Sequence, residues 1–383
     1  VEVQAGDDGM LAGGFAVGGG ITADDSVMGR LSVHHHQSNG FRENTYLNRD
    51  DTNGRNETTL RGRLKWSGGD NWQFNLAGFY ADVDDGYDAF AIDNSLTMLS
   101  DKPGKDAQES LGASFRADFD GPSGYTLTSI TSISDSDILF SFDADWGNDD
   151  AWAPVLYDYI SVSDRKRRTL SQEFRFVADN WLYGLYALRM EDDISTLNQG
   201  EYYDPGYDFA DSLDDLFVSE YEATNLAAFG QYEHAIGESS RLTFGLRVEQ
   251  RTTDYSDSAG LTQDPSETMW GGELAFSHTH SDAVTSFVSL SQGYKAGGFN
   301  LGPAVPDQYR EFDSESLLNL EAGIKATLLS RTLQLNASVF ASRHSDQQVR
   351  TSFQLNPGDP TSFGFVTINV EDGDTLGVEA DVR

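Results

Sequence analysis

Residues 286–300 read SFVSLSQGYKAGGFN, an alternating stretch that runs into a glycine-rich turn. Successive side chains of a β-strand point to opposite faces, so this alternation is typical of a pleated strand. One face carries Phe287, Ser289, Ser291 and Gly293, and the other carries Val288, Leu290, Gln292 and Tyr294. The paired Gly297 and Gly298 predict that the strand ends near Lys295, because glycine opens positive φ and has no side chain to pack.

The composition favours an all-β protein. The chain of 383 residues holds 38 Gly, 23 Phe, 16 Tyr and 6 Trp, but only 38% of its residues are hydrophobic. It has no apolar run of the ~18 residues that would indicate a transmembrane helix. A transmembrane strand needs only about 9–11 residues with alternate ones apolar, so a membrane location stays open.

The charge is strongly acidic. Lys and Arg number 26 against 62 Asp and Glu, which gives a net charge of −36. Nucleic acid is therefore not expected as a partner, since binding phosphates requires basic residues. We interpret most of the acidic residues as belonging to solvated loops. With no cysteine, the chain has neither disulfides nor thiolate metal sites.

Alternating segments recur in pairs along the whole chain. The predicted strands are Leu11–Ile21, Val27–Gln37, Glu57–Trp66, Trp72–Val83, Glu109–Phe119, Tyr125–Ser136, Arg168–Val177, Trp181–Asp192, Asn225–Ile236, Leu242–Tyr255, Met269–His280, Val284–Tyr294, Leu317–Leu328 and Leu333–Ser342, with Phe365–Arg383 beginning another pair. Short turns within the pairs alternate with long loops between them. The predicted long loops are Asn39–Arg55, Asp84–Ala107, Asp137–Lys166, Ile194–Glu222, Ser256–Ser266, Ala296–Glu315 and Asp346–Ser362.

This sorting of loops predicts an antiparallel up-and-down transmembrane β-barrel, whose two ends face different compartments. We expect a partial barrel of about fifteen strands. The two faces of the strands also agree with a transmembrane barrel. In one strand, apolar residues alternate with polar or small ones: Leu242, Phe244, Leu246 and Val248 with Thr243, Gly245, Arg247 and Glu249. Lipid would contact the first face and a wet lumen the second. Interfacial aromatic girdles would be formed by Trp66, Trp72, Tyr125, Trp181 and Tyr255.

The stretch GYKAGGFN resembles a signature segment in the barrel of TonB-dependent outer-membrane receptors. Four further segments resemble strands of that family: the pair Leu170–Phe176 and Trp181–Tyr186, then Asn319–Lys325, and Asn369–Glu379. The resemblance covers most of the chain but does not include the plug domain, the TonB-binding motif or the last strands. It implies that residues 1–383 form a barrel domain incomplete at both ends, with about fifteen of the about 22 strands of such transporters.

The resemblance also implies a function. It points to the Gram-negative outer membrane and to uptake of a bulky, scarce nutrient, most often a ferric siderophore, energised by TonB through the plug missing from this chain. The expected partners are outer-membrane lipid, TonB and the ligand, and the protein is expected to be a monomer. No cofactor is expected, and no nucleophile constellation indicates an enzyme. The alternatives are a passive porin-like channel and an extracellular β-rich glycan-binding protein or hydrolase.

Aromatic residues interleaved with Asp mark two predicted loops, Ser141–Ile160 and Gly200–Tyr221. Aromatic side chains in external loops can close over a bulky ligand by stacking. The candidate ligand-binding residues are Trp146, Trp152, Tyr157, Tyr159, Tyr202, Tyr203 and Tyr207.

A structural role is expected for the signature turn, which lacks the spacing of a phosphate-binding loop. Its residues are Gly293, Tyr294, Lys295, Gly297, Gly298, Phe299 and Asn300. No metal site is expected. Of the histidines 34–36 only the outer two would share a strand face, and the acidic pairs, such as Asp149-Asp150, lack the ligand spacing of a calcium loop.

Overall fold

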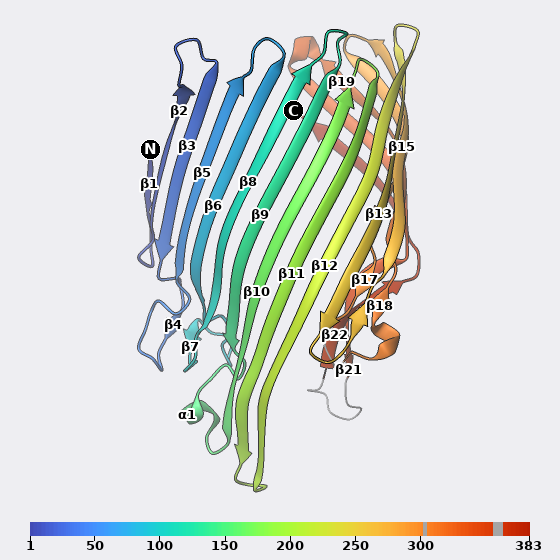
Figure 1. The fold of residues 1–383 in the computed structure, drawn as a ribbon. Helices are drawn as coiled ribbons and strands as arrows, with labels where there is room; N and C mark the ends of the chain where they lie inside the picture. Colours follow the sequence, from blue (N-terminus) through green and yellow to red (C-terminus); the bar gives the residue numbers. More distant parts are fainter. Residues whose placement is uncertain (302–304, 355–362) are drawn as a thin grey trace.

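The computed structural model describes residues 1–301, 305–354 and 363–383 (Figure 1). One antiparallel sheet dominates the fold, and each of its strands pairs with its neighbours in chain order. Its strands are β1 (Glu2–Ala5), β2 (Leu11–Gly20), β3 (Val27–Ser38), β5 (Arg55–Ser67), β6 (Trp72–Tyr87), β8 (Gly104–Asp120), β9 (Thr126–Asp143), β10 (Leu156–Val177), β11 (Trp181–Asp204), β12 (Phe209–Ile236), β13 (Ser240–Asp257), the short β14 (Thr262–Gln263), β15 (Ser266–Ser281), β16 (Val284–Lys295), β19 (Glu315–Leu328), β20 (Leu333–Ser345) and β23 (Gly373–Val382). The predicted all-β, up-and-down architecture is confirmed.

Small elements lie mostly in the connections at one end of the sheet. They are the pairs β4 (Glu43–Asn44) with β7 (Thr97–Met98), β17 (Gly298–Phe299) with β18 (Glu311–Phe312), and β21 (Gln347–Gln354) with β22 (Phe363–Val370), and the single turns α1 (Asp149–Trp152), η1 (Asp307–Tyr309) and η2 (Leu329–Arg331). No helix among the described residues is long and apolar enough to cross a membrane.

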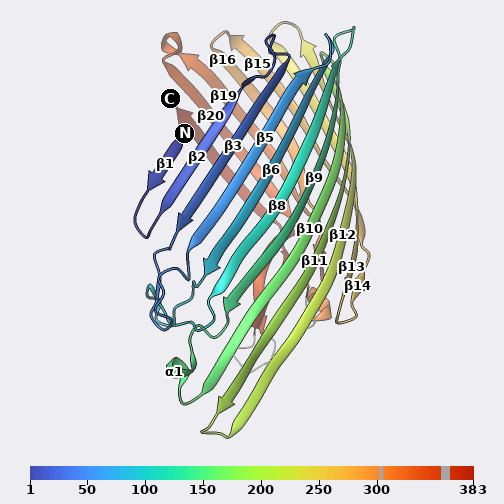
Figure 2. The same cartoon turned by 60° about the vertical axis from the view of Figure 1, so that its left-hand side comes forward.

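The sheet curls into a tall curved wall, with its last strands behind its first (Figures 1 and 2). Its edges are formed by β1 with β2 on one side and by β23 on the other. Within the described ranges, no strand pairing joins β23 to β1 or β2. The wall therefore has two unpaired edges, which expose backbone groups that can pair with further strands.

The predicted short turns are confirmed, but two predicted long loops, Asp137–Lys166 and Ile194–Glu222, contain much more strand than expected. The strands β10, β11 and β12 have 22, 24 and 28 residues. As a result β11 and β12 are joined only by residues 205–208, where the sequence had suggested a loop over Ile194–Glu222. Polar and acidic residues lowered the apparent strand character of this hairpin, yet strands outside a membrane can carry polar residues on both faces.

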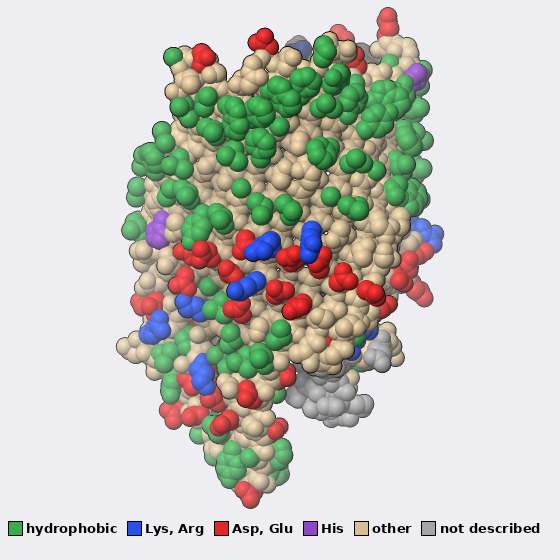
Figure 3. Space-filling model, in the orientation of Figure 1, with side chains coloured by type: hydrophobic (Ala, Val, Ile, Leu, Met, Phe, Trp, Pro, Cys, Tyr) green, Lys and Arg blue, Asp and Glu red, His purple; other side chains and the backbone are tan. Residues whose placement is uncertain are grey.

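The outer surface is divided into an apolar band next to the short turns and a belt of charge beyond it (Figure 3). We name the second feature the charged belt. It consists of Asp82, Glu109, Asp135, Asp137, Lys166, Arg168, Arg189, Glu191, Asp193, Glu220, Glu222 and Asp254, which share the outer face by strand register. On β10 the stretch between the belt and the short turn is Thr169–Val177, close to the about 9–11 residues of a transmembrane strand.

Cross-strand ion pairs link the charged belt. Arg168 Nε lies 3.0 Å from Asp135 Oδ2, and Arg189 Nη2 lies 2.8 Å from Glu222 Oε2. Burying so many carboxylate and guanidinium groups in hydrocarbon would cost much free energy, whereas the same groups are stable at a polar interface. The belt therefore agrees with the border of the predicted membrane-spanning region on the side of the long connections.

Stacked aromatic rings lie beside the short turns, at the other border of the apolar band. Trp66 stacks on Phe74 with centroids 5.1 Å apart, and Trp181 stacks on Tyr232 at 3.9 Å. These positions agree with the predicted interfacial girdle. The prediction was wrong for Tyr255, which is buried against Phe299 because it shares the inner face of β13 with Glu249.

Candidate functional site

An aromatic cluster lies beyond the charged belt on the inner face of the β10–β12 extension. We define the aromatic cluster as Trp152, Tyr157, Tyr159, Tyr202 and Phe209. Tyr157 is its centre, with ring centroids 5.4 Å from Trp152, 5.2 Å from Tyr159 and 6.1 Å from Tyr202. Tyr202 in turn lies 6.1 Å from Phe209. Five rings on one wall form a surface that could stack against a bulky ligand.

Strand register brings these rings together. Tyr157 and Tyr202 are direct partners on β10 and β11, and Tyr159 shares the face of Tyr157 because it is two residues further along β10. Trp152 ends the helical turn α1, whose N-cap Asn148 accepts hydrogen bonds from the amides of Asp150 and Ala151. The cluster is thus built from rigid strands and one capped turn.

The structure separates the seven aromatic candidates into four locations. Trp152, Tyr157, Tyr159 and Tyr202 meet in the aromatic cluster, and three of these belong to strands rather than to the predicted loops. Trp146 instead stacks on Phe90 at 5.2 Å. Tyr203 is on the strand β11 but faces away from Tyr202, and Tyr207 is 86% exposed in the β11–β12 turn.

Asp145 fixes the base of the aromatic cluster. Its Oδ1 accepts hydrogen bonds from Gly147 N at 2.9 Å and from Trp152 Nε1 at 3.2 Å, and its Oδ2 accepts one from Tyr159 N at 2.8 Å. Only 3% of Asp145 is exposed. A single buried carboxylate therefore holds both a ring and the strand that carries the next ring.

Burial raises the pKa of neighbouring groups in this region, outside the membrane band. The pKa of Asp143 is raised to about 7, chiefly by burial and further by Asp145, against a lowering by the Ser100 hydroxyl. Burial also raises the pKa of Tyr157, and the carboxylates of Asp145 and Asp143 add to that rise. The base of the cluster is therefore a carboxylate-rich environment of low polarity.

The signature turn binds two distant parts of the wall together. Phe299 packs against Tyr255 and Tyr221, with centroids 4.7 and 5.9 Å apart. The Asn300 side chain donates to Thr367 O at 2.8 Å and accepts from Thr367 N at 2.7 Å. The turn is therefore packed against the wall, and its structural role stays a prediction. Lys295 ends β16 as expected and Gly298 pairs with Phe312 in the small β17–β18 pair.

Tyr294 lies differently from its predicted face. It was grouped with Val288 and Leu290, yet its hydroxyl donates to Glu249 Oε2 at 2.9 Å and accepts from Arg247 Nε at 3.0 Å. Pairing of β16 with β15 stops at Gln292, which frees the strand end to twist. Space is left by Gly271, where a Cβ would meet the Tyr294 ring at 3.2 Å.

Replacing Gly297 with alanine is expected to destabilise the protein by about 1–3 kcal/mol, the usual cost of overpacking. A Cβ at Gly297 would lie 2.7 Å from the backbone oxygen of Phe312, which cannot move without disturbing β18. Gly293→Ala is the control, because its Cβ would meet nothing within 4 Å. Urea unfolding in lipid vesicles measures both, and equal stabilities of the two variants would contradict this packing.

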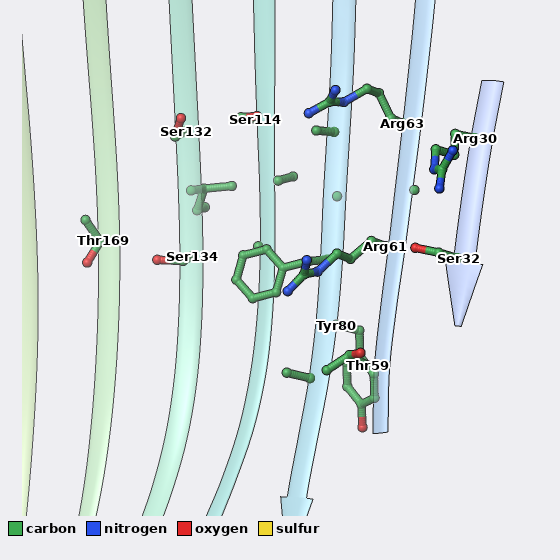
Figure 4. A pocket seen from close by; sticks show the side chains of 18 of the residues that line it. Arg30, Ser32, Thr59, Arg61, Arg63, Tyr80, Ser114, Ser132, Ser134 and Thr169 are labelled. Atoms are coloured by element: carbon green, nitrogen blue, oxygen red, sulfur yellow. The ribbon is translucent and has the colours of Figure 1, made fainter. Parts of the chain in front are cut away.

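A basic hollow of about 850 Å³ lies on the inner wall of β3–β9 (Figure 4). Arg30, Arg61 and Arg63 extend into it from β3 and β5, beside the small side chains of Ser114 and Ser132. Within the described ranges, these three arginines have no acidic partner at ion-pairing distance. In a chain with net charge −36, this is a local concentration of positive charge.

Sequence reasoning missed both the basic hollow and the buried group around Asp143. Arg61 and Arg63 do alternate with Leu60 and Leu64, which was a usable signal for a shared inner face. Asp143 gave none, because a single aspartate among the 62 acidic residues reads as a solvated loop residue.

The family model for the β-barrel of TonB-dependent receptors, described as "TonB dependent receptor-like, beta-barrel", matches residues 6–383. The chain belongs to the TonB-dependent receptor family. This family consists of transport receptors of the Gram-negative outer membrane, and the apolar band agrees with that location. The suggested resemblance is confirmed.

Solved structures share this fold at low sequence identity. The ferric yersiniabactin uptake receptor FyuA from Yersinia pestis superposes with a TM-score of 0.74 at 15% identity, over 98% of this chain and 56% of that one. The siderophore receptor PiuA from Acinetobacter baumannii gives 0.67 at 14%, over 99% and 60%. The copper transporter OprC gives 0.70 at 15%, over 99% and 57%. The chain thus spans somewhat more than half the length of these receptors.

Proposed function

We propose that the chain is part of the wall of an outer-membrane receptor that takes up a ferric siderophore with energy supplied through TonB. The observation that carries this proposal is the aromatic cluster, which lies on the inner face of the wall and beyond the charged belt. A ligand arriving from outside meets this surface before it meets the membrane-spanning lumen. Structural neighbours named as siderophore receptors support the choice of cargo.

For the domain organisation, we propose that residues 1–383 are a barrel domain completed by other segments. The unpaired edges at β1–β2 and β23 favour the presence of further strands in the whole protein, since an open edge in a membrane leaves backbone groups without hydrogen bonds. A plug that responds to TonB would occupy the lumen. The matched receptors are longer than this chain and leave room for both parts.

In the proposed mechanism the protein binds and conducts, with no covalent step. The strands β10–β12 hold the aromatic cluster rigidly outside the membrane, and its rings stack on the ligand there. Rearrangement of the plug then opens the lumen. On the way inward a negatively charged ferric chelate would pass the basic hollow, where Arg30, Arg61 and Arg63 offer unpaired positive charge.

Uptake of ⁵⁵Fe-labelled siderophores by iron-limited cells tests this function. A strain lacking the gene is expected to lose uptake of at least one ferric siderophore of a chemically varied panel, and the restored gene is expected to recover it. Removing TonB should abolish the same uptake. Uptake that continues without TonB would indicate the passive channel instead, and unchanged uptake of every siderophore in the deletion strain would refute the proposed cargo.

A further inference from the structure

A buried acidic group lies where the end of β9 and the start of β10 meet residues 99–102. Two hydrogen bonds join these segments: Asp101 N donates to Gly147 O at 3.0 Å, and Asn148 Nδ2 donates to Leu99 O at 2.6 Å. We name the group the acidic pocket and define it as Ser100, Asp101, Asp143 and Asp145. It lies beyond the charged belt, outside the membrane band.

The acidic pocket has more negative charge than its surroundings neutralise. The nearby cation is Lys102, whose ammonium group is ion-paired with Asp158. The charge of Lys102 also acts on Asp101 and Asp145, but among the described residues none of Asp101, Asp143 and Asp145 has an ion pair of its own. Burying unpaired charge is unfavourable, so the group must either bind protons or bind a cation.

Two nearly inaccessible oxygens in the acidic pocket have no partner. Asp143 is 5% exposed and Ser100 only 1%, yet Asp143 Oδ2 and Ser100 Oγ each lack a hydrogen bond. The two groups are nevertheless close enough for the hydroxyl to influence the pKa of the carboxyl group. Asp101 Oδ1 is a third buried oxygen without a partner. Unsatisfied buried oxygens are rare in native proteins and require an explanation.

We propose that the acidic pocket binds a calcium ion through Asp143 Oδ2, Ser100 Oγ and the Asp145 carboxylate. The group offers only oxygen ligands, which are those that Ca²⁺ prefers, and it contains no His or Cys for a softer metal. Among the described residues no three His, Cys, Asp or Glu side chains are arranged to hold a metal. The remaining ligands are therefore backbone carbonyls and water, which commonly complete flexible calcium sites.

The ion would order the base of the aromatic cluster. Asp145 already accepts hydrogen bonds from Trp152 Nε1 and Tyr159 N, so a cation on Asp145 fixes both through one group. It would also hold residues 99–102 against the end of β9. This role concerns loop order alone, and it does not depend on which ligand the receptor carries.

The test is calcium binding by the whole receptor, purified in detergent and stripped with EDTA. Equilibrium dialysis with ⁴⁵Ca²⁺ is expected to show one saturable site, and Ca²⁺ is expected to change the tryptophan fluorescence, to which Trp152 is one of six contributors in this chain. Asp143→Asn should weaken binding by at least about 100-fold and Ser100→Ala by about 10–100-fold, as for loss of a ligand or its support.

Asp149→Asn is the matched control, since Asp149 is an exposed carboxylate in the neighbouring turn α1. It should keep wild-type affinity. The migration of unheated protein in SDS gels differs from that of heated protein when the variant is folded, which checks the fold of each variant. If Asp143→Asn does not fold, Ser100→Ala alone tests the site. No saturable Ca²⁺ binding by the wild-type protein, or equal binding by the wild type and both pocket variants, would overturn the proposal.

Discussion

Replacing Leu185 with arginine is expected to destabilise the folded wall in lipid by about 2–4 kcal/mol, the cost of arginine near the bilayer midplane. Leu185 is 61% exposed on the outer face of β11 and pairs with Phe174 and Ala228. In water such an exposed side chain would tolerate arginine with little loss. Urea unfolding in phospholipid vesicles measures the difference.

Val218→Arg is the control for depth. Val218 also lies on the outer face and is 39% exposed, but it is beyond Glu220 and the rest of the charged belt. Arginine there should cost no more than about 1 kcal/mol, as found near the interfaces. Equal costs at the two positions would contradict the placement of the membrane between the short turns and the belt.

Removing three rings of the aromatic cluster is expected to weaken binding of the transported ferric siderophore by at least about 100-fold. The variant is Trp152→Ala, Tyr157→Ala and Tyr202→Ala together. Central aromatic residues of a binding surface commonly cost about 2 kcal/mol or more each when truncated, although such losses are not additive. Affinity is measured with the purified receptor and the siderophore identified by uptake.

Tyr203→Ala is the matched control for that variant. Tyr203 is adjacent to Tyr202 on β11 but points to the outer face, where its hydroxyl donates to Asp208 Oδ1 at 3.4 Å. Its loss should leave affinity unchanged. If Tyr203→Ala weakens binding as much as the triple variant does, the ligand does not approach along the inner face.

The sequence predicted the architecture because a barrel strand repeats one simple rule. The alternation from Leu242 to Glu249 indicates which face contacts lipid and which faces the lumen. The residues between strands indicate where each turn lies. The ends of β10, β11 and β12 beyond the charged belt escaped this reasoning. Outside the membrane neither face needs to be apolar, so stretches such as Ile194–Glu222 lost the pattern while keeping the hydrogen bonds.

The site was predicted only in part. Aromatic density pointed to Trp152, Tyr157, Tyr159 and Tyr202, but register across β10 and β11 was needed to place them together and to exclude Tyr203. The acidic pocket could not be foreseen, because it depends on residues 99–102 folding onto Asp143. Contacts of that kind between separate connections leave no periodic signal in the sequence.

Accessibility of single cysteines from outside intact cells tests the central claim, a wall that crosses the outer membrane with its aromatic cluster outside. The chain has no cysteine, so Tyr207→Cys and Glu238→Cys each provide one label site. Tyr207 is in the β11–β12 turn beyond the charged belt, and Glu238 is in a short turn at the opposite end. We predict that an impermeant maleimide labels position 207 in intact cells and position 238 only after permeabilisation. Labelling of position 238 alone, or of both positions in intact cells, would contradict the account.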